Sequence, residues 1–320
     1  MNPIKFIMAA RCEAAGRPTN EDNFQLSDDL TGNLWSFTTD NELSLSEKGA
    51  LLIVCDGMGG MKAGEVASQI AVETIKEHFS TEQLTGEVTA TAESIIRHIQ
   101  QAIIDADMQI KKEADKDIEK EGMGSTIVLA WIIDKSVYIG WCGDSRAYRF
   151  NPAVGLQRLM RDHSYVQSLV DTGQLSEELT FGHPNSNIIT KSLGNPLQEA
   201  EPDIEVYPLH DDDIILLCSD GLSGVLRDHV METLMRDNTD NMASCRDALW
   251  NAARDAGWHD NVTIGLCKIV SGCEQQTILP EQSNAAPAKP SLKRVWLLIA
   301  ALILVIAGLA VSIIMKCFCK

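Results

Sequence analysis

The chain alternates short apolar runs with longer segments in which apolar residues recur at helical spacing. Three of the apolar runs, at residues 51–55, 137–142 and 214–218, are each followed by an aspartate beside a glycine: Asp56, Asp144 and Asp220. Short apolar runs bounded by turn residues are typical of buried strands. The pattern therefore predicts three strands that each carry a carboxylate near one end.

Helical patterns and further strands fill the rest of the first 270 residues. Apolar residues at one helical face favour helices at 64–80, 90–120 and 240–256. Further strands are expected at 126–133, 136–141, 147–150 and 262–270. A tight turn at Asp134 and Lys135 joins the first two of these strands, and such hairpins pair antiparallel. The pattern alone predicts an α+β fold.

The C-terminal region differs in composition from the rest of the chain. Pro280, Pro287 and Pro290 stand among Gln, Ser and Ala in a stretch typical of a flexible linker. Residues 295–315 then run for 21 positions without a charge. At about 1.5 Å per residue, this length matches a hydrocarbon core of about 30 Å. We predict a folded domain at 1–270, a linker at 271–294, a transmembrane helix at 295–315 and a short tail at 316–320.

Cysteine usage indicates the compartment of the large domain. The nine cysteines include no Cys-x-x-Cys pair, which disfavours a zinc knuckle, and no signal-peptide pattern opens the chain. An odd number of unpaired cysteines favours a reducing compartment. We therefore expect a single-pass protein of the cytoplasmic membrane whose large domain faces the cytoplasm.

Composition and charge narrow the partners. Hydrophobic residues make up 45% of the chain and charged residues 22%, which allows a sizeable core. The formal net charge is −18, with 45 acidic against 27 basic side chains. Nucleic-acid binding needs clustered Lys and Arg that neutralise phosphates, so we expect no nucleic acid as a partner.

Acidic turns recur in five places. Besides the three strand ends, the segments 16–23 and 257–264 each place acids in a glycine-containing turn. Any one such aspartate is most simply a turn residue or a helix cap. Five together point to a shared site, because neighbouring carboxylates repel one another and divalent cations with oxygen ligands relieve that repulsion.

Eight short motifs stand in a fixed order along the chain. They are Arg-x-x-Asn-Glu-Asp (17–22), Asp-Gly-Met-Gly-Gly (56–60), Gly-x-x-x-Gly-Glu-x-Ala-Ser (60–68), Gly-Ser-Thr (124–126), Gly-Asp-Ser-Arg (143–146), Asp-His-Ser (162–164), Ser-Asp-Gly-Leu (219–222) and Asp-Asn-Val-Thr (260–263). Over residues 4–270 the chain resembles the bacterial metal-dependent serine/threonine protein phosphatases of type 2C. The resemblance implies a central antiparallel β-sandwich flanked by helix pairs.

The resemblance also implies a centre of two Mn²⁺ or Mg²⁺ ions. Asp56 would bridge both ions, the Gly57 carbonyl would contribute to one, and Asp220 and Asp260 would complete the second site. A bridging water between two such ions can attack a phosphate monoester. For Asp144 two roles stay open: binding a third ion together with Asp260, or acting as a turn aspartate paired with Arg146.

Three further residues are implied to assist catalysis. Glu21 and Asp22 correspond to acids that orient metal-bound waters. Arg17 corresponds to a phosphate clamp, because its planar guanidinium can grip phosphate with two hydrogen bonds, although an ordinary surface arginine is the alternative.

The general acid is left open by the sequence. Relatives carry histidine at the positions that Met58 and Met61 occupy here. A metal-bound water or His183, in the variable flap region at 165–195, are the candidates, whereas His163 is expected to be structural.

The predicted function is hydrolysis of phosphoserine and phosphothreonine in proteins by a metal-bridged water, at the membrane and on substrates of serine/threonine kinases. A cysteine phosphatase is disfavoured because only four residues separate Cys12 from Arg17, one fewer than a Cys-x₅-Arg loop needs. Two other hypotheses are kept: a pseudophosphatase that binds phosphoproteins without turnover, and a metal-dependent nuclease or small phosphoesterase.

Overall fold

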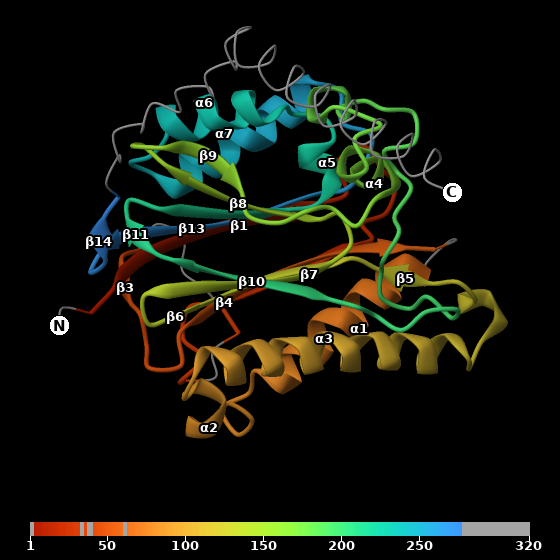
Figure 1. The fold of residues 1–320 in the computed structure, drawn as a ribbon, viewed down its shortest axis with the longest axis horizontal. Helices are drawn as coiled ribbons and strands as arrows, with labels where there is room; N and C mark the ends of the chain where they lie inside the picture. Colours follow the sequence, from red (N-terminus) through yellow and green to blue (C-terminus); the bar gives the residue numbers. More distant parts are fainter. Residues whose placement is uncertain (1–2, 33–34, 37–40, 60–62, 277–320) are drawn as a thin grey trace, which may run out of the picture. The chain divides into compact units, whose positions relative to one another are not determined.

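Two antiparallel sheets are stacked face to face in the computed structural model, which describes residues 3–32, 35–36, 41–59 and 63–276 (Figure 1). The first sheet has the order β3 (Leu43–Ser44), β1 (Lys5–Glu13), β13 (Val262–Ser271), β12 (Ile214–Cys218), β8 (Arg146–Asn151), β9 (Gly155–Arg158). The second has the order β10 (Asp203–Pro208), β7 (Ser136–Cys142), β6 (Ile127–Ile133), β4 (Ala50–Met58), β2 (Asp22–Ser27). The short strand β5 (Gly124–Ser125) also pairs with β4, and β11 (His210–Asp211) pairs with β14 (Glu274–Gln275).

Helices cover the outer face of each sheet (Figure 1). Helices α1 (Ala63–His78) and α3 (Ala92–Ala114) lie against the second sheet, with the short α2 (Gly86–Thr89) between them in sequence. Helices α6 (Asp228–Asp237) and α7 (Met242–Asp255) lie against the first sheet. Two further short helices, α4 (Tyr165–Asp171) and α5 (Asp220–Ser223), and 3₁₀ turns at Ile118–Lys120 and Glu177–Leu179 lie in the connections.

Apolar side chains fill three layers between these elements. Val54, Ile139 and Leu217 belong to the layer between the two sheets, while the outer layers pack α1 and α3 on one side and α6 and α7 on the other. All seven residues of β6 are buried, because helices cover one face of its sheet and the other sheet covers the opposite face. Burial on both faces explains why the central strands are continuous apolar runs and not alternating ones.

The structure confirms the α+β fold and the antiparallel sandwich flanked by helix pairs. The predicted helix at 90–120 ends earlier, at Ala114, because the charged residues that follow contribute no apolar face to the core. The compact unit ends at Gln276, beyond the predicted boundary at 270, because β13 continues to Ser271 and β14 follows it.

Among the residues that the structure describes, no helix has the length and apolar character of a membrane span. The predicted transmembrane helix at 295–315 and tail at 316–320 lie outside the described residues, as does the predicted linker from 277 onward.

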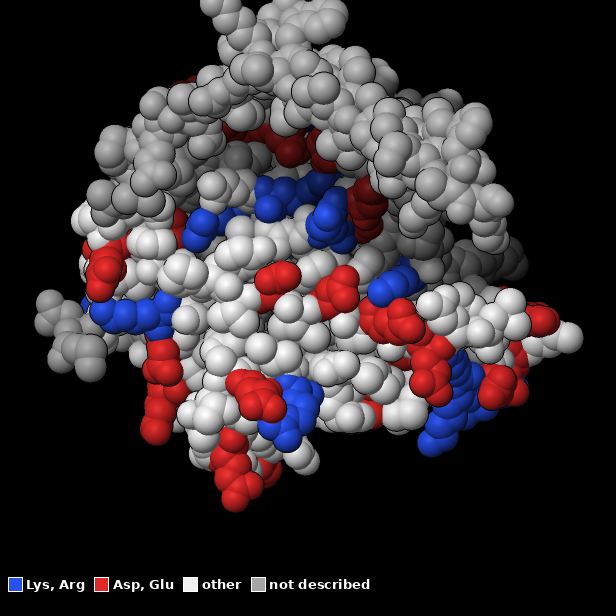
Figure 2. Space-filling view, viewed as in Figure 1, with Lys and Arg blue, Asp and Glu red and all other residues white. Residues whose placement is uncertain are grey.

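Charged side chains of both signs are interspersed on the described part of the face shown in Figure 2, and no broad basic surface is seen there. This distribution agrees with the net charge of −18.

Candidate metal centre

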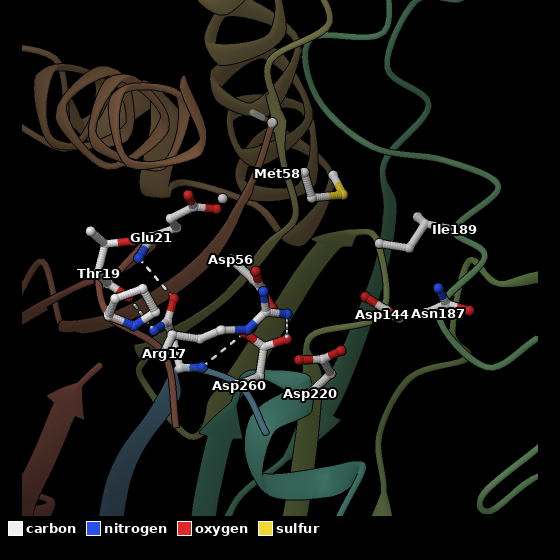
Figure 3. Close-up of a pocket in the computed structure, with 14 residues that line it drawn as sticks. Arg17, Thr19, Glu21, Asp56, Met58, Asp144, Asn187, Ile189, Asp220 and Asp260 are labelled. Carbon is white, nitrogen blue, oxygen red and sulfur yellow. Dashed lines mark hydrogen bonds and ion pairs between the residues drawn. The ribbon is translucent and has the colours of Figure 1, made fainter. Parts of the chain in front are cut away.

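Loops at one end of the sandwich converge on a cavity of about 350 Å³ (Figure 3). Four of its acids, Asp56, Asp144, Asp220 and Asp260, come from segments far apart in the sequence. Its other lining residues are Arg17, Pro18, Thr19, Glu21, Gly57, Met58, Gly59, Asn187, Ile189 and Asn261. The structure thus brings together seven of the eight residues predicted from the sequence, and the eighth, Asp22, is buried directly beside Asp56 in the neighbouring strand.

Asp56 lies near the end of β4, and its backbone is fixed by the adjacent strand. Its N–H donates to Thr126 Oγ1 at 3.0 Å, and its carbonyl accepts from the Thr126 N–H at 2.8 Å. Next to it, a Cβ added at Gly57 would stand 2.1 Å from the Gly64 carbonyl oxygen and 2.6 Å from that of Glu21. Only glycine fits this close approach of three backbone segments.

Asp22 is fixed by the register of β2 on β4, in which it pairs directly with Asp56. Its Oδ2 accepts hydrogen bonds of 2.7 Å from the Ser219 and Thr263 hydroxyls. Thr263 lies in β13 of the other sheet, and Ser219 directly follows β12 of that sheet, so Asp22 links the two sheets below the cavity. Burial raises the pKa of Asp22 to about 7, although both hydroxyl bonds act to lower it.

Asn261 ties the N-terminal loop to the segment that carries Asp260. Its side-chain amide donates to the carbonyls of Ala14 at 2.9 Å and Thr19 at 2.7 Å, and its Oδ1 accepts from the Glu21 N–H at 2.8 Å. The Asn261 N–H in turn donates to Asp260 Oδ1 at 2.9 Å. One side chain therefore sets the spacing between two candidate ligand segments.

The acids strongly affect one another's ionisation. Burial raises the pKa of Asp56 well above its ordinary value, and the charges of Asp22 and Asp220 raise it further. Burial also raises the pKa of Asp220, and the Asp260 charge acts in the same direction. Because Asp56 and Asp220 line the same cavity, ionising both carries an electrostatic cost that a cation would offset.

Two buried carboxylate oxygens without hydrogen-bond partners in the described part of the chain are the strongest indication of a cation site. Asp220 Oδ1 and Asp22 Oδ1 are buried and accept no hydrogen bond from any described residue. Buried acceptors of this kind are costly unless a donor or an ion satisfies them. Oxygen-rich sites of this composition suit Mg²⁺ or Mn²⁺.

The side chains do not, however, form a complete set of metal ligands. In the part of the chain that the structure describes, no three His, Cys, Asp or Glu side chains are grouped as a metal-binding set. One reason is visible at Asp260, whose Oδ2 accepts from Arg17 Nη2 at 2.8 Å (Figure 3). The cation that neutralises Asp260 is thus the Arg17 guanidinium, which also donates through Nε to the His259 carbonyl at 3.0 Å. The predicted phosphate clamp is at the cavity but is engaged with an acid.

Asp144 is buried, and its surroundings separate the two roles considered for it. Arg146 donates to both Asp162 oxygens, at 2.6 to 3.1 Å, and to the Tyr148 hydroxyl at 3.0 Å. No hydrogen bond or ion pair joins Arg146 to Asp144 among the described residues, so the turn-pairing alternative is not what the structure has. Burial raises the pKa of Asp144, and the strongest neighbouring charge is that of Asp220, not Asp260.

Neither His183, the histidine considered as the acid, nor His163, expected to be structural, lines the cavity. His163 is buried, with Nδ1 accepting from the Gly143 N–H at 3.2 Å and Nε2 3.1 Å from Asp203 Oδ2, a structural role. His183 accepts from the Asn185 N–H at 3.1 Å and does not line the cavity. Met61 lies outside the described residues.

Sequence reasoning missed several lining residues: Asn187, Ile189, Pro18, Thr19 and Asn261. Asn261 stood inside a quoted motif, and its position between two candidate segments could have identified it. Asn187 and Ile189 come from the flap region at 165–195, where no hydrophobic periodicity predicts how the backbone folds over the cavity.

Comparisons with known proteins agree with this site. The family model described as "Protein phosphatase 2C" matches residues 38–263. The chain is 35% identical over 222 residues to the serine/threonine phosphatase stp of Listeria innocua, covering 69% of this chain and 84% of that protein.

Two solved structures are similar over most of the compact unit. The serine/threonine phosphatase Stp1 from Staphylococcus aureus has a TM-score of 0.71 and 32% identity, over 83% of this chain and 95% of its own. The catalytic domain of PstP in complex with two manganese ions has a TM-score of 0.66 and 26% identity, over 84% of this chain and 100% of its own.

Proposed function

The chain belongs to the protein phosphatase 2C family and is a protein-serine/threonine phosphatase. We propose that it hydrolyses phosphoserine and phosphothreonine with two divalent ions, Mn²⁺ or Mg²⁺, at the cavity described above. The observation that carries the metal dependence is the buried Asp220 oxygen, which has no hydrogen-bond partner among the described residues and belongs to a cavity that Asp56 also lines. The manganese ions of the related PstP catalytic domain support the same choice of metal.

Asp56, the Gly57 carbonyl, Asp220 and Asp260 would hold these two ions. Asp144 lines the same cavity as Asp220 and Asp260, so a third ion would be held by Asp144 together with Asp260, as expected from the sequence, or with Asp220. When bound, such ions supply positive charge that activates water and neutralises the phosphoryl oxygens.

The protein side chains divide the remaining tasks. Arg17 releases Asp260 and grips two phosphoryl oxygens of the substrate, since its guanidinium is exposed at the cavity edge. Glu21 lines the cavity, and Asp22 below it is fixed by Ser219 and Thr263, so both acids orient the water that attacks phosphorus. In this arrangement Arg17 alternates between an acid and the substrate.

The proton for the leaving serine or threonine oxygen must come from water or from a carboxyl group. No histidine is among the described residues that line the cavity, and Met58 and Ile189 make one side of it apolar. Glu21 lines the cavity and burial raises its pKa, so this carboxyl holds its proton more readily than an exposed glutamate and is one protein group placed to donate it.

The experiment for this function compares the full chain with Asp56→Asn and Asp220→Asn variants on a phosphothreonine peptide and a phosphodiester. We expect wild-type hydrolysis of the peptide to require added Mn²⁺ or Mg²⁺, and both variants to lose at least about 100-fold in kcat. Peptide hydrolysis in EDTA, or a preference for the diester, would contradict the proposal. The pseudophosphatase alternative is disfavoured because all the predicted acids are present at one site.

We also propose that residues 295–315 anchor the protein in the cytoplasmic membrane, with the catalytic unit on the cytoplasmic side. The support is the uncharged run of 21 residues in the sequence. Tethering would concentrate the phosphatase near proteins phosphorylated by membrane kinases. Fractionation of cells tests this: the full chain should sediment with membranes and a chain lacking 291–320 should not. Equal distribution of the two chains would rule out the anchor.

A further inference from the structure

A buried aspartate that does not line the catalytic cavity, Asp107, lies on α3. Asp107 is buried, with a side-chain exposure of only 2%. It faces residues 193–200, the segment that leads from the flap back toward β10 and is named here the flap root. Figure 1 shows this part of the chain passing β5 near the C-terminal end of α3.

Both oxygens of Asp107 bind the flap root. Oδ1 accepts from the Gly194 N–H at 2.7 Å, and Oδ2 accepts from the Ala200 N–H at 3.1 Å. Lys111, one turn further along α3, donates to Asp107 Oδ2 at 2.7 Å and to the Gln198 carbonyl at 2.7 Å. Five residues therefore form one network that clasps the two ends of the flap root to the helix.

The chemistry of this network requires a carboxylate. Three donors converge on two acceptor oxygens, and an asparagine would offer one acceptor while presenting its own N–H groups to the backbone donors. The part of α3 that carries Asp107 is held in place because the neighbouring residues Ala106 and Ile110 are buried in the layer between α3 and the sheet.

Gly194 allows the flap root to pack closely against α3. Its φ of +84° lies in the left-handed region, and an added Cβ would stand 2.5 Å from the Met123 carbonyl oxygen and 2.6 Å from Ile110 Cγ2. A side chain at this position would push the flap root away from α3.

The flap root connects in turn to the catalytic strand. Leu193 and Ser125 exchange backbone hydrogen bonds of 3.1 and 2.8 Å, and the Ser125 hydroxyl donates to the Asp56 carbonyl at 3.1 Å. A few residues before Leu193, Asn187 and Ile189 form the flap side of the catalytic cavity. The Asp107 network thus determines how the flap side of the cavity, formed by Asn187 and Ile189, is positioned relative to Asp56.

We propose that Asp107 is a positioning residue for phosphoprotein turnover, which it serves by fixing the flap root so that Asn187 and Ile189 face the substrate peptide beside the phosphate. This inference rests on the proposed phosphatase function. Asp56 is also held by its pairing with Asp22 across β4 and β2 and by its bond to Thr126, neither of which involves the flap root. We therefore expect Asp107 to affect the flap side of the cavity and to leave metal binding unaffected.

The test measures kcat and KM of the full chain on two substrates, a phosphothreonine peptide that reaches the flap wall and p-nitrophenyl phosphate that does not. Asp107→Asn should raise the peptide KM about fivefold, the usual effect of losing one hydrogen bond, and Asp107→Ala should raise it about tenfold or more. For both variants, kcat/KM on p-nitrophenyl phosphate and the Mn²⁺ affinity from calorimetry should stay within about twofold of wild type.

Two further variants complete the design. Glu93→Gln on the same helix, where Glu93 is exposed and pairs with Arg97, should leave kcat and KM unchanged on both substrates. Lys111→Met leaves the two backbone bonds of Asp107 in place and should have a smaller effect than Asp107→Asn.

Equal losses on both substrates, or a peptide KM unchanged in Asp107→Asn, would overturn the proposal. The Asp107→Asn and Lys111→Met results decide it even if Asp107→Ala fails to fold. A wild-type chain inactive on both substrates would instead contradict the phosphatase function itself.

Discussion

Burial, more than any single neighbour, controls the protonation of the acids at this centre. It is the largest cause of the raised pKa of Asp22, Asp56, Asp144 and Asp220. A group of carboxyls that resists ionisation in the absence of cations becomes a strong set of ligands once divalent charge is present. The sequence identified these positions because each lies in an acidic turn near an apolar strand, but it could not show which carboxyls line one cavity.

Asp22 gives a pH-dependent stability that can be measured. An aspartate in the unfolded chain titrates near about 3.9, and burial raises the native pKa of Asp22 to about 7. The native state therefore binds this proton more tightly, and the stability that it contributes is complete below about pH 4 and lost as the pH rises to about 7. In EDTA, urea denaturation should show the unfolding free energy falling over this window, and falling less in Asp22→Asn. Identical slopes for the two chains would contradict the assignment.

Arg17 should affect metal and substrate binding in opposite directions. Because it pairs with Asp260 at 2.8 Å, Arg17→Ala should free that carboxylate and strengthen Mn²⁺ binding about two- to fivefold, the range for an exposed ion pair. The same variant should raise the KM for phosphopeptide, and Arg17→Lys should restore it only in part. Calorimetry and steady-state kinetics measure both effects. Arg254→Ala removes an exposed arginine paired with Asp255 and should change neither; unchanged Mn²⁺ affinity in Arg17→Ala would refute the competition.

At the level of elements, helix α3 carries Asp107 and Lys111, which bind the flap root, and it begins with a capping box. Thr91 accepts from the Ser94 N–H at 3.1 Å, and the Ser94 hydroxyl accepts from the Thr91 N–H at 3.1 Å. Thr91→Ala should lower the unfolding free energy by about 1 kcal/mol in urea denaturation. Thr85 precedes α2 without any side-chain cap bond, so Thr85→Ala should be nearly neutral. Equal losses from both substitutions would show that the cap at Thr91 contributes nothing.

The elements were predictable where the apolar pattern is strong. Strands β6, β7 and β13 follow continuous apolar runs, and the expected positions differ from the observed ones only at their ends. The helix ending at Ala114 was predicted too long because charged residues with good helix propensity follow it, and propensity alone does not end a helix. The flap was not predictable, since its fold depends on bonds to Asp107 and Ser125 from distant parts of the chain.

At the scale of the whole molecule, the position of the site follows from pairing between distant strands. The pattern indicated antiparallel hairpins, but the resemblance to a family supplied the two stacked sheets. Register is what the sequence could not give: the pairing of Asp22 with Asp56 across β2 and β4, and the hydroxyl bonds that reach Asp22 from the other sheet, are set by contacts between segments about 30 to 240 residues apart. The catalytic end of the sandwich is therefore a property of the complete compact unit.

The most direct measurement of the central claim is anomalous diffraction at the manganese edge from crystals of the protein grown with Mn²⁺. We predict two manganese peaks in the cavity, coordinated by oxygens of Asp56, Asp220 and Asp260, with Arg17 no longer bonded to Asp260. The absence of manganese from this cavity, with the Arg17–Asp260 ion pair intact, would contradict the account.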